Sequence, residues 1–316
     1  MKVGIDVSKL TFDASWIDGE NHQQHCFDYT DLGIEAFIEL MASDAHIVME
    51  ATGVYHSRLA LKCYEAGLSV SVVNPVAIKR FGQMLLKRDK SDKADAVLIR
   101  LYAESQDPEQ WKPSSESINS LRQALGWIDD LTRERTMVSN REEAIRHNAA
   151  PCEFVVYEIR DLRKYLKERI QRAEQYLKAT VKKHFPELYE RLQTIPSVGE
   201  KTATEMIVIT EGFTKFASDK ALAAYVGVSP TTYSSGTSVR GRGGISRASK
   251  GRTRQLLYLC SWTARRSNPA CTALYNRMIA AGKPPKVISI ALAHKLLRQI
   301  FAVGMSSQNY RAEYAY

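Results

Sequence analysis

The stretch KVGIDV, residues 2–7, is a short β-forming run that carries an acid close to its end. Two more β-prone runs follow at residues 12–16 and 24–29, where they could be antiparallel neighbours of the first. Residues 34–41 then have the apolar spacing of an amphipathic helix. The opening of the chain therefore predicts three strands in a meander, followed by a helix.

Strand and helix signals alternate in the next part of the chain. An apolar run at residues 45–49 is followed by a helical stretch at 55–65, and a glycine closes that helix before a strand at 68–73. Pro75 ends the strand and is well placed to open the next helix, because the first turn of a helix does not need its missing N–H. A meander followed by β-α-β alternation predicts an α/β domain with a mixed sheet.

Between residues 118 and 189 the pattern changes to long, charged helices, and Pro151 is expected to separate two antiparallel arms. Apolar residues spaced four, four, three, four and four apart form one stripe near the coiled-coil period: Leu162, Leu166, Ile170, Ala173, Leu177 and Val181. The stripe is equally compatible with a helical hairpin that packs on its own domain and with an arm for self-association.

A second globular domain is expected beyond Pro186. Residues 192–203 resemble the hairpin of a helix-hairpin-helix element, which presents backbone N–H groups to a phosphate, although Ser197 replaces the first glycine of the usual turn. Residues 234–254 are rich in Gly, Ser and Arg and read as a loop, with helix expected from Gln255. Such a loop cannot build a core, so its value must lie in what it touches.

The net charge of +9 is concentrated in one part of the chain. Between Asp219 and Glu313 there is no Asp or Glu, whereas residues 220–312 contain 15 Lys and Arg. The other residues have 29 basic side chains against 35 acidic ones, so the whole positive excess lies in this C-terminal segment. An acid-free basic segment is typical of a domain that binds a polyanion, and we interpret it as a nucleic-acid-binding domain.

Composition excludes several classes of protein. The 316 residues are 44% hydrophobic and 25% charged, which predicts about two globular domains and argues against a disordered chain. Five widely spaced cysteines and seven histidines form none of the usual disulfide or zinc patterns. The N-terminus has no apolar signal region, and no uncharged stretch reaches the length of a spanning helix. We therefore expect a soluble cytoplasmic protein with reduced thiols, of bacterial type and associated with the nucleoid.

Two acids end apolar strands, and two more open a helix. Asp6 follows Val3-Gly4-Ile5, Glu50 follows residues 47–49, and Asp92 and Asp95 are three residues apart on one helix face. Four converging oxygen ligands would suit Mg²⁺, which holds phosphates and neutralises charge during phosphoryl transfer. Taken singly, each acid is better explained as a solvated strand end or as a complement to the helix dipole, so only the combination predicts a site.

The order of these acids, a strand Asp, a Glu that ends a later strand and a D-x-x-D helix, resembles that of a RuvC-like, ribonuclease-H-type nuclease domain. Further blocks resemble the signature blocks of the DEDD transposases of the IS110 type, relatives of the Piv invertase. The blocks cover nearly the whole chain, at residues 4–9, 50–55, 73–75, 92–96, 195–203, 224–230, 235–236, 245–246 and 250–251.

This resemblance implies an α/β RuvC-like N-terminal domain at residues 1–112 and a helical coiled-coil arm at 113–188. A mainly α, basic transposase domain at 189–316 would carry the helix-hairpin-helix-like element. The resemblance implies a catalytic tetrad that binds Mg²⁺ and a serine nucleophile, and the residues are Asp6, Glu50, Asp92, Asp95 and Ser235. The implied partners are donor and target DNA and a guide (bridge) RNA encoded by the element, and the implied assembly is a homodimer or homotetramer.

The residues alone do not choose a nucleophile. Any serine of the 234–254 loop could hydrogen-bond a phosphate, and these serines are Ser234, Ser235, Ser238, Ser246 and Ser249. The Ser-Gly dipeptide of the family falls on Ser235, with Ser234 as the chief alternative. Basic side chains of the same loop are expected to clamp nucleic-acid phosphates, namely Arg240, Arg242, Arg247, Lys250, Arg252 and Arg254.

Three functions compete at this point. The leading one is an insertion-sequence transposase that cuts and rejoins DNA through a serine-phosphodiester intermediate. The second is a hydrolytic RuvC-like nuclease or Holliday-junction resolvase, which uses the acids but leaves the Ser-Gly-Arg loop unexplained. The third is a non-catalytic nucleic-acid-binding protein, for which the basic segment suffices. A covalent protein–DNA species, clean nicks or neither would distinguish them.

Overall fold

The computed structural model describes residues 1–51, 53–86, 91–231, 234–235, 239–240, 244–245 and 251–312. The chain divides into two compact units, Met1–Pro113 and Ser114–Tyr316. Each unit has its own hydrophobic core, so the two are described separately.

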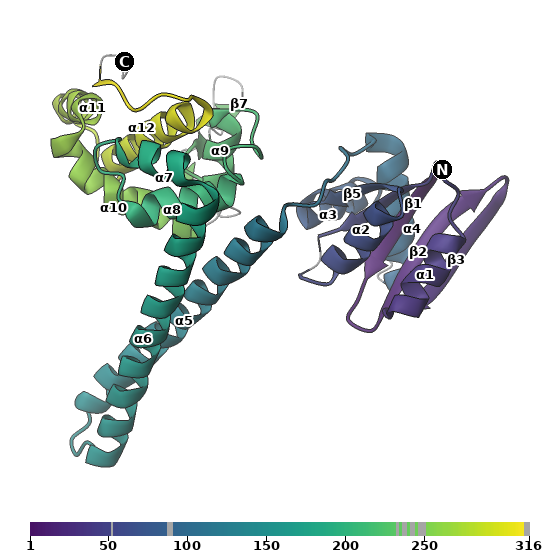
Figure 1. Ribbon diagram of the computed structural model, residues 1–316, viewed down its shortest axis with the longest axis horizontal. Coiled ribbons are helices and arrows are strands. Elements are labelled where there is room, and N and C mark those ends of the chain that lie inside the picture. Colours follow the sequence, from purple (N-terminus) through teal and green to yellow (C-terminus); the bar gives the residue numbers. More distant parts are fainter. Residues whose placement is uncertain are drawn as a thin grey trace. The chain divides into compact units, whose positions relative to one another are not determined.

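The first unit is built on a mixed five-stranded sheet in the order β3-β2-β1-β4-β5 (Figure 1). The first three strands form an antiparallel meander, and β1, β4 and β5 are parallel. Their bounds are β1 Lys2–Val7, β2 Thr11–Asp18, β3 Asn21–Asp28, β4 His46–Glu50 and β5 Ser69–Val73. The predicted meander, the β-α-β alternation and the mixed sheet are therefore confirmed.

Helices cover both faces of this sheet. Alternate strand residues such as Ile47 and Met49 pack with α1 (Asp31–Glu39) and α2 (His56–Glu65). Val48, which points to the opposite face, packs with α3 (Pro75–Met84) and α4 (Asp92–Gln106). The central strands β1 and β4 are therefore buried on both faces, and polar side chains reach solvent at their ends, whereas the edge strand β3 is largely exposed.

Local sequence explains where these helices begin. The side chain of Thr30 accepts a hydrogen bond from the N–H of Gly33 at the start of α1. Asn74 caps α3 in the same way and Pro75 occupies its first turn, as the sequence predicted. Ser91 caps α4 by accepting from the N–H of Ala94. These caps satisfy N–H groups that have no partner within the helix.

The second unit begins with a long antiparallel hairpin of α5 (Glu116–Arg146) and α6 (Glu153–His184) (Figure 1). In the predicted apolar stripe, Leu166, Ile170, Leu177 and Val181 are buried and Ala173 is partly buried against the same core. Leu162, nearest the hairpin end, is 43% exposed. The stripe therefore packs within its own chain, as in the first of the two alternatives that the sequence left open.

A buried carboxylate lies near the far end of this hairpin. Glu142 on α5 is only 3% exposed, and the guanidinium groups of Arg146, Arg160 and Arg163 surround it. Arg163 Nη1 lies 2.8 Å from Glu142 Oε2. These ion pairs join the two helices, because Glu142 lies on α5 and Arg160 and Arg163 lie on α6.

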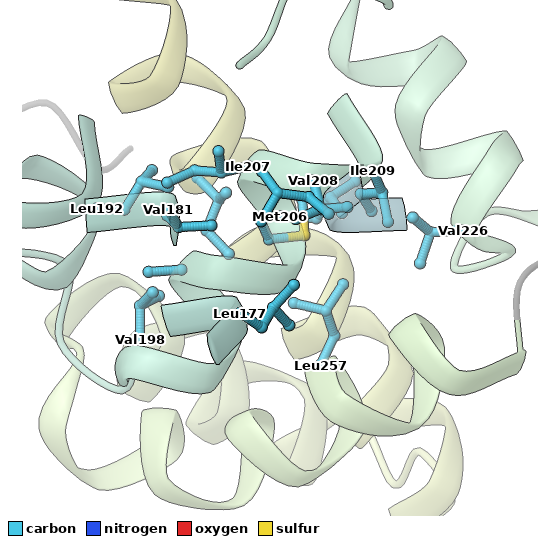
Figure 2. Close-up of a cluster of buried hydrophobic side chains, with 14 of the residues drawn as sticks. Leu177, Val181, Leu192, Val198, Met206, Ile207, Val208, Ile209, Val226 and Leu257 are labelled. Carbon is cyan, nitrogen blue, oxygen red and sulfur yellow. The ribbon is translucent and has the colours of Figure 1, made fainter. Parts of the chain in front are cut away.

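The rest of the second unit is a helical domain with a large core (Figure 2) and a smaller apolar cluster of Ala264, Cys271, Ile288 and Leu292. Its helices are α7 Pro186–Gln193, α8 Glu200–Thr210, α9 Asp219–Val226, α10 Gly251–Ser267, α11 Pro269–Ala280 and α12 Pro285–Met305. All residues of α8 from Thr202 to Thr210 are buried. Leu177 and Val181 of the hairpin pack into the same cluster as Met206 of α8, so the hairpin is anchored in this domain.

Among the described residues, α12 is the one helix long and apolar enough to cross a membrane by length and composition. In the structure it packs beside α10, α9 and α7. Leu292, Leu296 and Ile300 are buried in the protein interior. This burial is that of a core helix.

The segment that the sequence predicted as a loop, residues 234–254, contains three two-residue strands, and a fourth lies just before it. Pro230–Thr231 (β6) pairs with Gly244–Ile245 (β9), and Ser234–Ser235 (β7) pairs with Val239–Arg240 (β8), both antiparallel. In addition, α10 begins at Gly251 and not at residue 255. The predicted start of the helix at residue 255 was therefore wrong, because Arg252 and Thr253 contact Glu205 and belong to the first turn of α10.

Candidate functional site

Two of the four predicted acids lie on adjacent parallel strands. The register of β1 and β4 pairs Ile5 with Met49, so Asp6 and Glu50 are the next residues on the two strands. Both are partly buried. Glu50 is in turn the register partner of Val73 at the end of β5. The two acids therefore stand side by side at the carboxyl edge of the parallel part of the sheet.

Both acids share the face of the sheet that α4 covers. Side chains alternate along a strand, so Asp6 lies on the same face as Gly4, and Glu50 on the same face as Val48. Val48 belongs to the core beneath α3 and α4. Asp92 and Asp95 lie in the first turn of α4, which therefore brings them over this edge. The structure thus brings together the four acids that the sequence singled out.

Gly4 sets how closely α4 approaches the sheet. A Cβ atom at Gly4 would lie 2.2 Å from the backbone nitrogen of Arg100 and 2.3 Å from the carbonyl oxygen of Ala96. No side chain fits in that space, so the backbone of α4 lies directly on β1. Gly4 is therefore a positioning residue for the acids of α4, a role that its place two residues before Asp6 could have indicated.

The pKa of the Asp6 carboxyl reflects the negative charges gathered in this cluster. Burial raises its pKa, and the neighbouring charges of Asp95, Asp92, Glu50 and Asp13 raise it further, from 3.8 to about 6. The other acids of the cluster therefore lie close enough to repel the Asp6 charge. An arrangement that gathers like charges is destabilising unless a cation or a proton compensates it.

Asp13 is a fifth acid at this site, and the sequence reasoning missed it. It lies on β2 directly opposite Asp6 in the antiparallel register and is buried. Burial raises the pKa of Asp13, and the charge of Asp92 adds to this, whereas Lys93 and Cys26 oppose it. The signal that could have found Asp13 is an acid within the β-prone run at residues 12–16.

The chemistry of these carboxylates fits a divalent cation. They offer hard oxygen ligands, and the raised pKa of Asp6 indicates negative charge that a cation would neutralise. Within the described part of the chain, however, no three His, Cys, Asp or Glu side chains are placed so that they could hold a metal ion as they stand. The carboxylates would have to draw closer around a bound ion.

The predicted nucleophile lies in the second unit. Ser234 and Ser235 form β7, in which Ser235 pairs with Val239 and Ser234 pairs with Arg240. For Ser234, Ser235 and Arg240 the structure describes the backbone alone. The predicted phosphate ligands Arg242, Arg247 and Lys250 lie outside the described residues. The nucleophile assignment therefore remains a prediction.

Arg252, another predicted phosphate ligand, is held by two acids. Its Nε atom lies 3.0 Å from Glu205 Oε2 on α8, and its Nη1 atom donates to Asp129 on α5. Thr253 Oγ1 donates to the same buried Glu205 over 2.7 Å. Burial alone lowers the pKa of Arg252, but the two carboxylates raise it above its ordinary value. These contacts tie the first turn of α10 to α8 and α5. Arg254, in the same turn, also has an interaction partner.

The segment predicted to resemble a helix-hairpin-helix element, residues 192–203, spans the end of α7, the turn after it and the start of α8. Ser197, which stands where the usual turn has glycine, adopts a φ of +81°. Its hydroxyl lies 2.7 Å from that of Ser267 on α10. The turn therefore takes the left-handed backbone that normally requires glycine, and Gly199 caps α8. Phosphate binding at this turn stays a prediction.

Two family models match the chain. One, for the DEDD transposases of IS110 and described as Transposase, matches residues 3–148. The other, described as Transposase IS116/IS110/IS902 family, matches residues 189–276. The first match contains all four predicted acids, and the second contains Ser235.

Known proteins also resemble the chain. The pilin gene-inverting proteins of Moraxella lacunata and Moraxella bovis are each 30% identical to it over 314 residues, which cover 95% of this chain and 94% of each relative. An insertion element IS110 protein of Streptomyces coelicolor is 34% identical over 115 residues, 35% of this chain and 27% of that protein. Together with the two family models, the full-length relatives show that the chain belongs to the IS110 family of transposases.

Proposed function

We propose that this transposase cuts and rejoins DNA through a covalent serine ester, with a divalent metal ion at the acidic edge of its sheet. The observation that carries the proposal is the gathering of Asp6, Glu50, Asp92 and Asp95 on one face, with the pKa of Asp6 raised to about 6. A purely structural domain gains nothing from such repulsion. A site that handles phosphates needs a cation, and carboxylates are its usual ligands.

The four carboxylates would hold the cation, and Mg²⁺ is the ion that best fits an all-oxygen set. When bound, it would neutralise the negative charge that builds up on the phosphate during attack. Asp13, which is paired with Asp6 in the register of β1 and β2, would add its negative charge to the same cluster. Gly4 would hold α4 at the distance from β1 that keeps Asp92 and Asp95 over the site.

Ser235 would supply the nucleophile. Its oxygen would attack the phosphorus, and the bond from phosphorus to the leaving strand would break. The proton of the serine hydroxyl would end on the released strand's oxygen. The serine ester keeps the phosphodiester bond energy, so a hydroxyl of another strand can reverse the step and rejoin DNA. Hydrolysis would discard that energy, so the ester suits recombination better than a plain nuclease.

Basic side chains would hold the DNA. Arg240, Arg242, Arg247, Lys250, Arg252 and Arg254 are proposed as phosphate ligands around the serine. Arg252 could take this role only by exchanging Glu205 and Asp129 for a phosphate. The partners would be donor and target DNA with a guide RNA, and the working assembly a homodimer or homotetramer.

The folds of the two units support this proposal. A sheet with three antiparallel strands followed by two parallel ones, and with acids at β1, β4 and a following helix, is what a RuvC-like, ribonuclease-H-type domain requires. The buried contact between α5 and α6 is compatible with coiled-coil packing of the helical hairpin, because the buried residues of α6 follow the predicted stripe.

Recombination assays test the proposal. Asp6→Asn, Glu50→Gln, Asp92→Asn and Asp95→Asn keep the shapes of the side chains, and each should abolish strand cleavage while DNA binding survives. Asp18→Asn is the matched control, because Asp18 is an exposed acid at the end of β2 that lies away from the cluster. Recombination at the parental rate by the four variants would remove the metal site from the mechanism.

A further inference from the structure

The helical hairpin has a surface hollow that lies outside the acid-free basic segment. The hollow has a volume of about 660 Å³ and lies between α5 and α6. Ala124 and Ala173 are partly buried against the core and form its floor. Trp127, Tyr176, Arg169 and Arg172 line it above this floor. Ala124 and Trp127 are three positions apart on α5, and Arg172 and Ala173 follow Arg169 by three and four positions on α6, with Tyr176 seven positions after Arg169, so each helix contributes one continuous face.

The two aromatic side chains in the hollow are not part of the hairpin core. Trp127 and Tyr176 are each 53% exposed, whereas their sequence neighbours Ile128 and Leu177 are buried in the seam between the helices. The seam is therefore complete without the two rings. Large aromatic surfaces that face water beside small residues are typical of a binding surface.

The charge of the hollow differs from that of a larger cavity of the second unit. That cavity, of about 1100 Å³, mixes basic side chains with acids such as Asp129, Glu174 and Glu205. The described residues that line the hollow include Arg169 and Arg172 and no acid. The guanidinium of Arg169 also lies 4.7 Å from the ring centre of Tyr165, which orients it at one end of the hollow. The hollow is thus complementary to an anionic ligand with flat rings.

We propose that this hollow binds unpaired nucleotides of a single-stranded nucleic acid. Trp127 and Tyr176 stack on bases, and Arg169 and Arg172 hold the adjoining phosphates. The small side chains of Ala124 and Ala173 leave the hollow open beside the two rings, where a base could stack. The inference extends the proposed function, because it gives the hairpin of α5 and α6 its own contact with nucleic acid. It requires no cleavage chemistry, so binding measurements alone test it.

Fluorescence anisotropy with the full-length protein tests this site. The probes are a labelled 20-nucleotide oligouridylate, the matching oligothymidylate and a 20-base-pair DNA duplex. Trp127→Ala and Tyr176→Ala should each weaken single-strand binding about tenfold, the loss expected for one stacked base. Trp127→Phe keeps a ring and should retain most of the affinity. Tyr157→Ala is the control, because Tyr157 is 67% exposed on the same helix but does not line the hollow.

The salt dependence gives a second readout. The double variant Arg169→Gln with Arg172→Gln should reduce the slope of log K against log salt by about 1.4, since each contact to a single strand contributes about 0.7. A larger effect on oligouridylate identifies RNA as the source of the nucleotides, and a larger effect on oligothymidylate identifies DNA. Duplex binding should stay at the parental level in every variant, so a failure of this proposal is distinct from a failure of the proposed function.

Single-strand affinity that stays at the parental level in both the aromatic and the arginine variants would overturn the inference. If the same variants also lose self-association in analytical ultracentrifugation, the hollow is instead a contact between copies of the chain.

Discussion

Asp6 and Glu142 are both carboxylates withdrawn from water, yet their surroundings move their pKa values in opposite directions. Burial raises the pKa of Glu142, but Arg146, Arg163 and Arg160 more than reverse this effect, and its pKa falls below the ordinary value. Burial also raises the pKa of Asp6, and four further acids raise it more, to about 6. The sheet edge gathers charges of one sign, whereas the hairpin pairs charges of opposite sign.

The difference distinguishes a candidate metal site from a structural ion-pair cluster. At Glu142 the arginines supply the compensation within the chain, and the result is a contact between two helices. The same holds for Arg252, which has Glu205 and Asp129 as partners. At the sheet edge, burial and the neighbouring carboxylates both disfavour the charged form of Asp6, and a cation or a proton would relieve this repulsion. A metal ion that holds a phosphate would do so.

The largest expected effect is on catalysis at the sheet edge. Asp6→Asn removes one charge and keeps the shape, and we expect cleavage to fall by more than about 100-fold. In the absence of divalent cations the same variant should be more stable than the parent, by about 1 kcal/mol, because it relieves repulsion at a partly exposed group. Cleavage rates and chemical denaturation in EDTA measure the two effects. If Asp6→Asn is less stable than the parent protein in EDTA, the comparison is contradicted.

The close contact between β1 and α4 gives the next effect. Gly4→Ala places a Cβ atom against the backbone of Arg100, so α4 must move away, and we expect a loss of about 2 kcal/mol in stability together with reduced cleavage. Gly126→Ala is the matched control: Gly126 is an exposed residue of α5 with open space around it. That change should stabilise the protein slightly. Urea denaturation of both variants checks the prediction, and equal behaviour would refute it.

The next prediction concerns Glu142, the carboxylate that is paired with arginines. Glu142→Gln leaves three arginines without their shared charge and should lower the melting temperature at pH 7 without changing cleavage chemistry. Because the pKa of Glu142 lies below its ordinary 4.5 in the folded protein, its stabilising contribution is present above that value and disappears as the pH falls through the lowered pKa. Melting curves of parent and variant should therefore converge in acid. A constant difference down to pH 3 would count against the assignment.

The smallest effect concerns the turn before α8. Ser197 adopts a positive φ that costs about 1 kcal/mol for a residue with a side chain. Ser197→Gly removes this strain but also its hydroxyl contact with Ser267 and some rigidity of the unfolded chain, so we expect a gain of about 0.5 kcal/mol. Ser267→Ala isolates the hydroxyl contact. Destabilisation by Ser197→Gly beyond that of Ser267→Ala would show that the strain is absent.

The sequence predicted what depends on local patterns. The strands and helices of the first unit follow from alternation, Pro75 and the caps, so their order could be predicted well. The four acids could be proposed because two end strands and two open a helix. Their convergence could not be derived in detail, because it depends on the register of β1 with β4 and on the contact that Gly4 allows.

Long-range partners were beyond such reasoning. Asp129 and Glu205 bind Arg252 from 123 and 47 residues away, and nothing local indicates either pairing. The early start of α10 has the same origin, because Thr253 and Arg252 are both tied to Glu205. Asp13 was missed for a different reason: it becomes part of the site only through its antiparallel pairing with Asp6.

The central claim is that carboxylates of the sheet edge and Ser235 act in one cleavage reaction that conserves the phosphodiester bond. The most direct measurement is trapping of the protein on labelled DNA with Mg²⁺ and the guide RNA, followed by peptide mapping of the adduct. The account predicts a DNA-linked peptide modified at Ser235, absent from Ser235→Ala and from Asp6→Asn. Clean nicks without an adduct would instead indicate a hydrolytic nuclease, and a label on Ser234, or an adduct formed by Ser235→Ala, would contradict the nucleophile assignment.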